Sequence, residues 1–439
     1  MERSSEDTDE TQPQNLTSEE IMIQTSQSDD SSGLFNMLSR YNARKNKRRY
    51  RDRRGSSSSS SEEGYDSPYV FGKLKIIPSS TCHWNIACLD LVGVIYSDDY
   101  FPSPLGVLDL IFEKTGNFGP LTEKDKEHVN NVQDSMSFSM SAKELLQLTT
   151  DKRESVLIPV SKQIEKDLDN LHLQLELRHK LDIADPINFI NAVQVMIAYQ
   201  DAHCFDRKGY RKSVGGVPED MFVDMVKEFS KLCKLLPLPG SAFVGNTEIC
   251  FDKRVQVTAK SDIILVPGAY SVDILSKTVT GKRRQPHVVS VVEVKNLEYS
   301  INKNYVGMEH EKRRHSNSSS EASENELSIH AGKPILQWFN PDILAKHGGD
   351  LLLLDQFFTE QLEGTDGLRE YLPGIIVVGT EVTFTVLEIK TGHLTDVKNK
   401  LCEGGKATIF YSKPRDFLLK EDRDILVEAF TRLNNGWVD

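Results

Sequence analysis

The sequence lacks a Cys-x-x-Cys motif, since its six cysteines are scattered over 439 residues. Nothing therefore indicates a zinc ribbon or a thioredoxin-like motif, and the scattered thiols suit a nuclear or cytoplasmic protein. The chain also lacks an apolar run of the ~20 residues that a transmembrane helix needs. Its N-terminus, MERSSEDTDETQPQN, is polar and acidic, unlike a secretory signal. We expect no insertion into a membrane.

Two further features are scarce. No GxxxxGK[ST] or GxGxxG motif occurs, so the sequence gives no support to a kinase or another nucleotide-binding enzyme. Hydrophobic residues make up only 38% of the chain, which predicts that part of it does not fold. The net charge of −12 argues against a protein that coats nucleic acid along its whole surface, although local basic patches can still steer a polyanion.

Residues 1–66 are predicted to be a disordered tail, since they are rich in Ser, Asp, Glu, Gln and Asn. This tail contains the basic run RKNKRRYRDRR at residues 44–54, in which eight of eleven residues are Lys or Arg. The run indicates either a nuclear-import signal or nucleic-acid contact, or else a solvated charged segment. Protein partners could also bind through this tail.

Residues 67–215 are predicted to form a mixed, largely helical region, for which the sequence indicates no role. Residues 216–439 are predicted to form an α/β domain with a mixed central sheet flanked by helices. A Ser-rich, charged stretch at 300–330 has no apolar period and is expected to be a flexible insertion. Expected helices of this domain span 218–236, 341–362 and 421–433, and expected strands span 247–251, 253–259, 262–266, 287–296, 374–378, 381–389 and 406–411.

The strand HVVSVVEVKN, residues 287–296, ends in two opposite charges. Alternation places Glu293 and Lys295 on the same face as Val289 and Val291. Both faces are apolar before that end, which predicts a central strand covered on both sides. Charges at the carboxyl end of such a strand lie where α/β proteins tend to bind ligands.

A second carboxylate is predicted to lie beside Glu293. Asp262 opens the apolar strand DIILV, and antiparallel pairing of this strand with 287–296 would bring Asp262 close to Glu293. Two carboxylates at one point suit Mg²⁺ or Mn²⁺, and Lys295 could position an attacking water. Asp273, in SVDIL, is an alternative to Asp262 that would give a tighter hairpin. The plain alternative to a metal site is a structural ion pair between Glu293 and Lys295.

An acid on one strand followed by Glu-x-Lys on the next resembles the PD-(D/E)XK nuclease superfamily. The resemblance covers about half of the chain and assigns Asp262, Glu293 and Lys295 to the three motif positions. It departs at the first motif, where Ser261 precedes the acid in place of proline. The resemblance implies a restriction-endonuclease-like fold in the order helix, three strands, helix, strand, with Mg²⁺ or Mn²⁺ as cofactor.

The same resemblance implies further residues on the two helices of that core. An acid on the first helix would be Glu228 or Glu219, and a glutamine near the second would be Gln337. Basic clusters on both sides of strand 287–296 are expected to contact nucleic acid; they are Lys282, Arg283 and Arg284, and Lys312, Arg313 and Arg314.

Glu-x-Lys alone is a weak motif, since Glu388-Ile-Lys390 also ends an apolar strand. We favour Glu293 and Lys295 because an acid-bearing strand precedes them in the required order. The expected function is therefore a metal-dependent nuclease that acts on DNA or RNA. The alternative is a catalytically inactive protein of the nuclease fold that serves as an adaptor or nucleic-acid-binding module.

Overall fold

The structure is a computed structural model of the chain, in which residues 69–439 form one compact unit. It describes residues 77–149, 152–153, 156, 177–204, 217–250, 254–268, 288–296, 333–358, 364–365, 368–398 and 407–435. The predicted tail, at 1–66, and the predicted insertion, at 300–330, lie outside the described residues.

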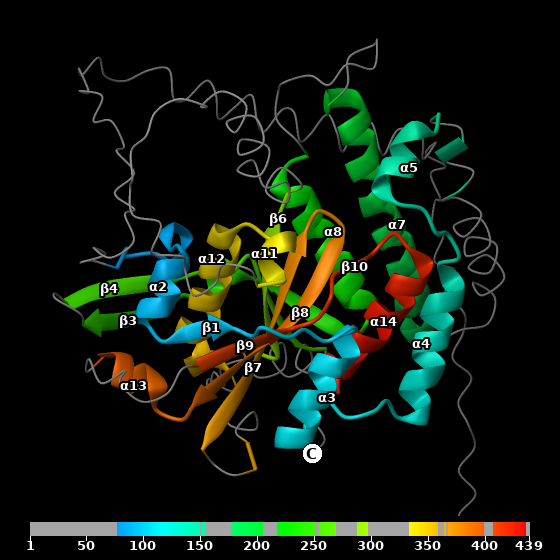
Figure 1. The fold of residues 1–439 in the computed structure, drawn as a ribbon. Coiled ribbons are helices and arrows are strands. Elements are labelled where there is room, and N and C mark those ends of the chain that lie inside the picture. The colour runs from blue at the N-terminus through cyan, green and yellow to red at the C-terminus, as the bar shows by residue number, and fades with distance from the viewer. Residues whose placement is uncertain are drawn as a thin grey trace, which may run out of the picture. The chain divides into compact units, whose positions relative to one another are not determined.

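A mixed sheet of eight strands forms the centre of this unit (Figure 1). The strands lie in the order β1-β9-β8-β7-β6-β5-β2, and β10 pairs with β8. The pairs β6–β7 and β1–β9 are parallel, and the other neighbours are antiparallel. The strands are β1 (Val94–Tyr96), β2 (Leu235–Pro239), β5 (Ile263–Pro267), β6 (Ser290–Lys295), β7 (Arg369–Val378), β8 (Glu381–Lys390), β9 (Ala407–Tyr411) and β10 (Arg415–Asp416). The predicted α/β class with a mixed central sheet is confirmed.

Helices pack on both faces of the sheet and enclose two apolar cores (Figure 1). One face is covered by α3 (Pro104–Thr115), α4 (Glu123–Ser135), α8 (Glu219–Leu232) and α14 (Lys420–Asn434), with α7 (Leu177–Cys204) packed against α8. The other face is covered by α2 (Ile86–Leu91), α12 (Pro341–Leu353) and the hairpin β3 (Gly245–Cys250)–β4 (Arg254–Ala259). Shorter helices are α5 (Ala142–Gln147), α11 (Ile335–Trp338) and α13 (His393–Lys398). Within the described residues, no helix combines the length and apolarity that a membrane-spanning segment needs.

The central position predicted for β6 is confirmed, because β6 lies between β5 and β7 and contributes to both cores. Val291 faces the core under α12, whereas Val292 and Val294 face the core under α8. Val289 was expected on the face of Val291 but lies in the opposite core. Leu265 is aligned with Ser290 and also accepts a hydrogen bond from the Val289 amide at 2.9 Å. Two consecutive residues, Val289 and Ser290, thus lie opposite one residue of β5, and the alternation of faces breaks there.

Residues from the region 67–215 complete the sheet that was expected from 216–439 alone. β1 pairs with β9 in parallel, with Val94 aligned with Ala407. Helices α3 and α4 pack against α14, near the C-terminus. One edge of the sheet and part of its cover therefore come from the region to which the sequence assigned no role.

The opposite edge is β2, whose sequence LLPLP was not predicted as a strand. Pro237 and Pro239 lack the amide hydrogen that a central strand needs for pairing on both sides. Among the strands that the structure describes, β2 pairs with β5 alone, so the prolines are tolerated at this edge.

Candidate active site

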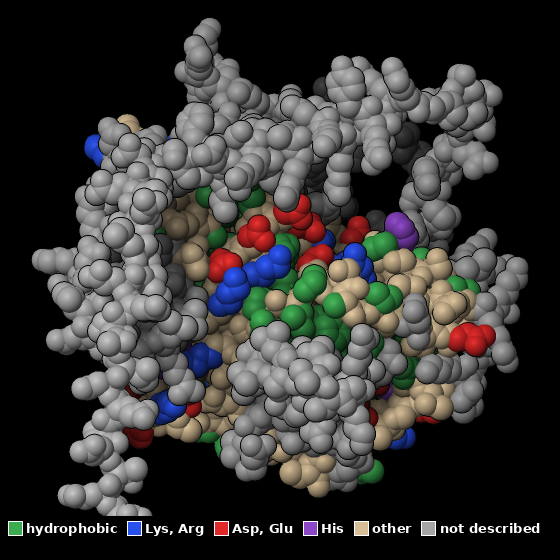
Figure 2. Space-filling view, turned by 180° about the vertical axis from the view of Figure 1, so that it is seen from behind, with side chains coloured by type: hydrophobic (Ala, Val, Ile, Leu, Met, Phe, Trp, Pro, Cys, Tyr) green, Lys and Arg blue, Asp and Glu red, His purple; other side chains and the backbone are tan. Residues whose placement is uncertain are grey.

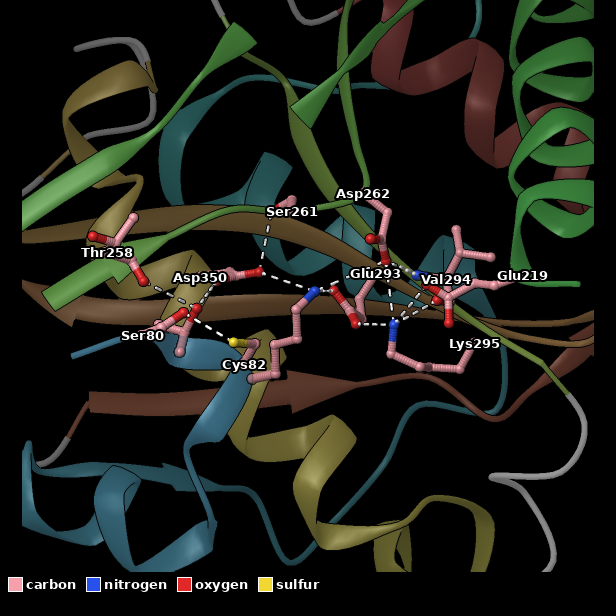
Figure 3. A network of polar contacts seen from close by, with 12 residues as sticks. Ser80, Cys82, Glu219, Thr258, Ser261, Asp262, Glu293, Val294, Lys295 and Asp350 are labelled. Atoms are coloured by element: carbon pink, nitrogen blue, oxygen red, sulfur yellow. Dashed lines mark hydrogen bonds and ion pairs between the residues drawn. The ribbon is translucent and has the colours of Figure 1, made fainter. Parts of the chain in front are cut away.

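Two acidic side chains meet where β5 begins and β6 ends. β5 and β6 pair antiparallel, with Ile263 aligned with Val292. Asp262 lies one residue before β5; its amide donates to the Val292 carbonyl at 3.2 Å, and its Oδ2 accepts from the Val294 amide at 2.9 Å. These bonds hold Asp262 opposite Glu293, as the sequence predicts (Figure 3).

Lys295 lies between these carboxylates and an acid from helix α8. Its Nζ is 2.7 Å from Glu293 Oε1, 3.5 Å from Asp262 Oδ2 and 3.2 Å from Glu219 Oε1. Nζ also donates to the Val294 carbonyl at 2.8 Å. Asp262, Glu293 and Lys295, the three residues predicted as the centre of the site, are thus brought together (Figure 3).

Helix α12 adds a second lysine and a third carboxylate. Lys346 Nζ is hydrogen-bonded to Glu293 Oε2, and it lies 3.8 Å from Asp262 Oδ2 and 3.6 Å from Asp350 Oδ2. Sequence reasoning missed this pair. The signal was present in PDILAKHGGD, because a lysine and an aspartate four residues apart share a helix face. Ile343, three residues before Lys346, is buried on the same side of the helix.

Asp350 is held from two sides. Thr81 Oγ1, in the 3-10 turn Thr81–His83, donates to Asp350 Oδ1 at 2.6 Å. Ser261 Oγ donates to Asp350 Oδ2 at 3.4 Å. The N-terminal part of the described chain therefore helps to build this side of the cluster (Figure 3).

Burial controls the charges in the cluster. The Glu293 side chain is 1% exposed, and this burial raises its pKa to about 8 against the opposing effect of Lys346. Burial also raises the pKa of Asp350, again opposed by Lys346. For both lysines burial acts to lower the pKa, but the nearby carboxylates, Glu293 first, outweigh it and raise the pKa. Both lysines are therefore cations at neutral pH.

The donor set fits a hard divalent cation, but the present spacing does not. Within the described residues, no group of three or more His, Cys, Asp and Glu side chains is arranged to hold a metal ion. Lysine ammonium groups lie among the carboxylates instead. Glu293 Oε1 is buried and lies 2.7 Å from the Lys295 ammonium, and Oε2 is bonded to Lys346, so an ion would have to compete with both lysines for this carboxylate. Asp262 and Glu293 are the residues that could bind Mg²⁺ or Mn²⁺.

Other predicted site residues lie apart from this cluster or outside the described residues. Glu228 pairs with Lys231 at 2.6 Å and is about 13 Å along α8 from Glu219, given 1.5 Å per helical residue. Gln337 is exposed on α11. Asp273 and the clusters Lys282, Arg283, Arg284 and Lys312, Arg313, Arg314 fall outside the described residues.

The second Glu-x-Lys motif lies at the opposite end of the sheet. β6 and β7 are parallel and β8 is antiparallel to β7, so the carboxyl end of β8 lies beside the amino end of β7. Glu388 pairs there with Arg369, and Lys390 is exposed. This motif is therefore an internal control for the one in β6.

Gly240 keeps the backbone of Asp262 in place. The Gly240 amide donates to the Asp262 carbonyl at 3.1 Å, and a Cβ on Gly240 would lie 1.7 Å from the Ser261 carbonyl oxygen. We expect Gly240→Ala to lower the free energy of unfolding by about 3 kcal/mol, as severe overpacking does, measured by urea denaturation. The control is Gly116→Ala, where φ is +79° but no atom lies within 4 Å of the new Cβ. That control should cost only about 1 kcal/mol of conformational strain, so equal losses would contradict the steric argument.

Comparison with known proteins assigns no family to this site. The sequence matches no protein-family model, and no curated protein matches it at a significant level.

Proposed function

We propose that the protein is a metal-dependent phosphodiesterase that cleaves nucleic acid, built on a core like that of the PD-(D/E)XK nucleases. One observation carries the proposal: Asp262 and Glu293 meet at the ends of adjacent antiparallel strands, with Lys295 in contact with both. This is the set of residue types, in the same chain order, that the resemblance assigns to the site.

The order of elements supports the same proposal. Helix α8 is followed by β2, β5 and β6, which are adjacent and antiparallel, then by α12 and by β7, which is parallel to β6. Helices α8 and α12 pack on opposite faces of the sheet. This succession of helix, three strands, helix and strand is what the resemblance implies, and the β3–β4 hairpin is an addition between the first two strands.

The proposed cofactor is Mg²⁺ or Mn²⁺, bound by Asp262 and Glu293. Such an ion would lower the pKa of a bound water and offset the negative charge of a phosphate. The chain's own contribution is positional: the Val294 amide orients the Asp262 carboxylate. Lys295 holds a positive charge beside both carboxylates, where it can orient water or a phosphate oxygen, and Glu219 fixes the ammonium from the side of α8.

The test is cleavage of single-stranded and double-stranded DNA and RNA in Mg²⁺ or Mn²⁺. We expect Asp262→Asn and Lys295→Met each to reduce cleavage by at least about 100-fold, the loss typical of removing one charge-stabilising group. The matched controls are Glu388→Gln and Lys390→Met, from the motif at the other end of the sheet, which should cleave like wild type. Full cleavage by Asp262→Asn would disprove the assignment.

The alternative proposal, an inactive protein of the nuclease fold, is favoured by the position of Lys346. Its ammonium already neutralises Glu293, the residue that a catalytic ion would need. A protein of this kind would bind nucleic acid or a protein partner without cleaving it. Binding without metal-dependent cleavage, unchanged by Asp262→Asn, is the result expected for this alternative.

A further inference from the structure

Lys346 is surrounded by carboxylates from three separate segments. Its Nζ is bonded to Glu293 Oε2 from β6, and it lies 3.8 Å from Asp262 Oδ2 before β5 and 3.6 Å from Asp350 Oδ2 on its own helix. The lysine side chain is 13% exposed and Glu293 is 1% exposed. A cation at the meeting point of several carboxylates occupies the kind of position that a divalent ion takes in an oxygen site.

The spacing suits an ammonium and not a metal ion. Carboxylate oxygens lie about 2.7–2.9 Å from an ammonium nitrogen but about 2.0–2.6 Å from Mg²⁺ or Ca²⁺. Asp262 and Asp350 are farther still from Nζ, at 3.8 and 3.6 Å. An ion bound to Asp262 and Glu293 would therefore draw the carboxylates inward and would repel an ammonium left in place.

Glu293 also needs a positive charge in the absence of a metal. A buried carboxylate without a cation is costly, and it can avoid that cost by taking up a proton. Lys295 supplies one contact, at Oε1, but directs its hydrogen bonds to Glu219 and to the Val294 carbonyl. Lys346 bonds to the other oxygen, Oε2, and its charge opposes the rise in the pKa of Glu293 that burial causes.

A second acceptor for Lys346 is already in place. Asp350 is four residues further along the same helix, and its carboxylate is held by Thr81 at 2.6 Å and by Ser261 at 3.4 Å. A change of side-chain rotamer would move the ammonium from Glu293 toward Asp350, because residues four apart lie on one helix face. The backbone of α12 would not have to move.

We infer that Lys346 is a displaceable counter-cation: it occupies the divalent-ion position in the metal-free protein and retreats to Asp350 when the ion binds. This inference rests on the proposed function, because it assumes that Asp262 and Glu293 bind the ion. It makes metal binding a competition between an internal and an external cation. The apparent metal affinity of the wild type is then lower than that of the carboxylates alone.

The experiment is calorimetric titration of the full chain with Mn²⁺. We expect Lys346→Met to bind Mn²⁺ at least about tenfold more tightly than wild type, a difference of 1.4 kcal/mol. Lys346→Gln, which retains a donor toward Glu293 but no charge, should also gain affinity and guards against misfolding of the methionine variant. Lys346→Arg retains the charge and should bind no more tightly than wild type.

A matched control comes from α14, where Lys420 pairs with Asp424 at 2.7 Å with the same four-residue spacing. Lys420→Met removes one positive charge, as Lys346→Met does, and should leave the Mn²⁺ affinity unchanged. Binding by wild type with equal or weaker binding by Lys346→Met and Lys346→Gln would overturn the inference and leave the proposed metal site standing. Absence of Mn²⁺ binding in all variants, or binding that persists in Asp262→Asn/Glu293→Gln, would overturn the proposed metal site as well.

Discussion

Replacing Arg423 with methionine is expected to lower the free energy of unfolding by about 4 kcal/mol or more, since each buried acceptor left without a donor costs about 1–3 kcal/mol. The Arg423 side chain is fully buried at the start of α14. Its Nη1 donates to the carbonyls of Phe417 and Leu418 at 3.0 and 3.2 Å, and its Nη2 donates to those of Met136 and Phe138. Methionine fills similar space but satisfies none of these four carbonyls.

The same contacts explain why lysine is not an adequate replacement. The guanidinium carbon also lies 4.1 Å from the centre of the Phe138 ring, so the group is stacked as well as hydrogen-bonded. The planar guanidinium group can donate hydrogen bonds to carbonyls on two sides at once, whereas the single ammonium group of lysine cannot reach all four. Burial lowers the pKa of Arg423 to about 10, which still leaves it charged at neutral pH.

Chemical denaturation monitored by circular dichroism would measure the loss for Arg423→Met and Arg423→Lys. The control is Arg369→Met, because the Arg369 side chain is 53% exposed and pairs with Glu388 at the surface. That substitution should cost at most about 1 kcal/mol, as exposed pairs do. A loss at Arg423 no larger than that at Arg369 would show that the four carbonyls find other donors.

Acid is expected to destabilise the protein through His347. This side chain is 1% exposed in α12 and its Nε2 lies 2.8 Å from Thr385 Oγ1 on β8. Burial, together with the charge of Lys346, lowers the pKa of His347 to about 3. The folded protein therefore keeps this imidazole neutral under conditions in which the unfolded chain, with a pKa near 6.5, binds a proton.

The direction follows from which state holds more protons. Between pH 6.5 and about 3 the unfolded state does, so the free energy of unfolding falls as the pH falls, by up to about 1.4 kcal/mol per pH unit. The contribution of His347 is fully present above pH 6.5. We expect His347→Gln to remove this part of the slope when denaturation is measured between pH 7 and pH 4. The difference between wild type and variant cancels the titration of other groups.

Thr385→Val is the control for the hydrogen bond alone. It removes the partner of Nε2 but leaves the imidazole buried, so it should lower stability at every pH and keep the wild-type slope. A slope unchanged in His347→Gln would show that the acid sensitivity arises elsewhere.

The central strands, and the meeting of Asp262, Glu293 and Lys295 at their ends, were predictable because local pattern and packing agree. In β6 the apolar residues are buried and the charges appear only at its end. Apolar residues on both faces of the strand were therefore enough to indicate that it is covered on both sides. The pairing of Asp262 with Glu293 followed from two apolar strands and a single register. Val289 was misplaced because alternation assumes a regular pairing, and the pairing is irregular at Leu265.

The parts that were not predictable depend on contacts distant in sequence. β1 has only three residues, and nothing local shows that it joins β9. β2 was obscured by its prolines, which are acceptable because β2 lies at the edge of the sheet that the described residues form. Lys346 and Asp350 look like surface charges in the sequence. Their role appears only when α12 packs on the end of β6, which brings Lys346 to Glu293.

One described face of the protein carries charges of both signs. Figure 2 shows one face on which acidic and basic side chains lie next to each other, bordered by hydrophobic ones. A long polyanion that approached this face would gain little from such a mixed field at a distance, so binding at this face would depend on close contacts and would fall less steeply with salt. The salt dependence of nucleic-acid binding would therefore report how many phosphate groups the basic residues contact.

The pairing of β1 with β9 has a consequence for synthesis of the chain. Val94 and its partner Ala407 are made far apart in time. At ~10 residues per second, roughly half a minute separates them on the ribosome. Strand β1 and the α3–α4 cover must therefore wait until β9 and α14 have been synthesised. In that interval the apolar residues of β1 and α3 lack their partners from β9 and α14, and they are what a chaperone would meet.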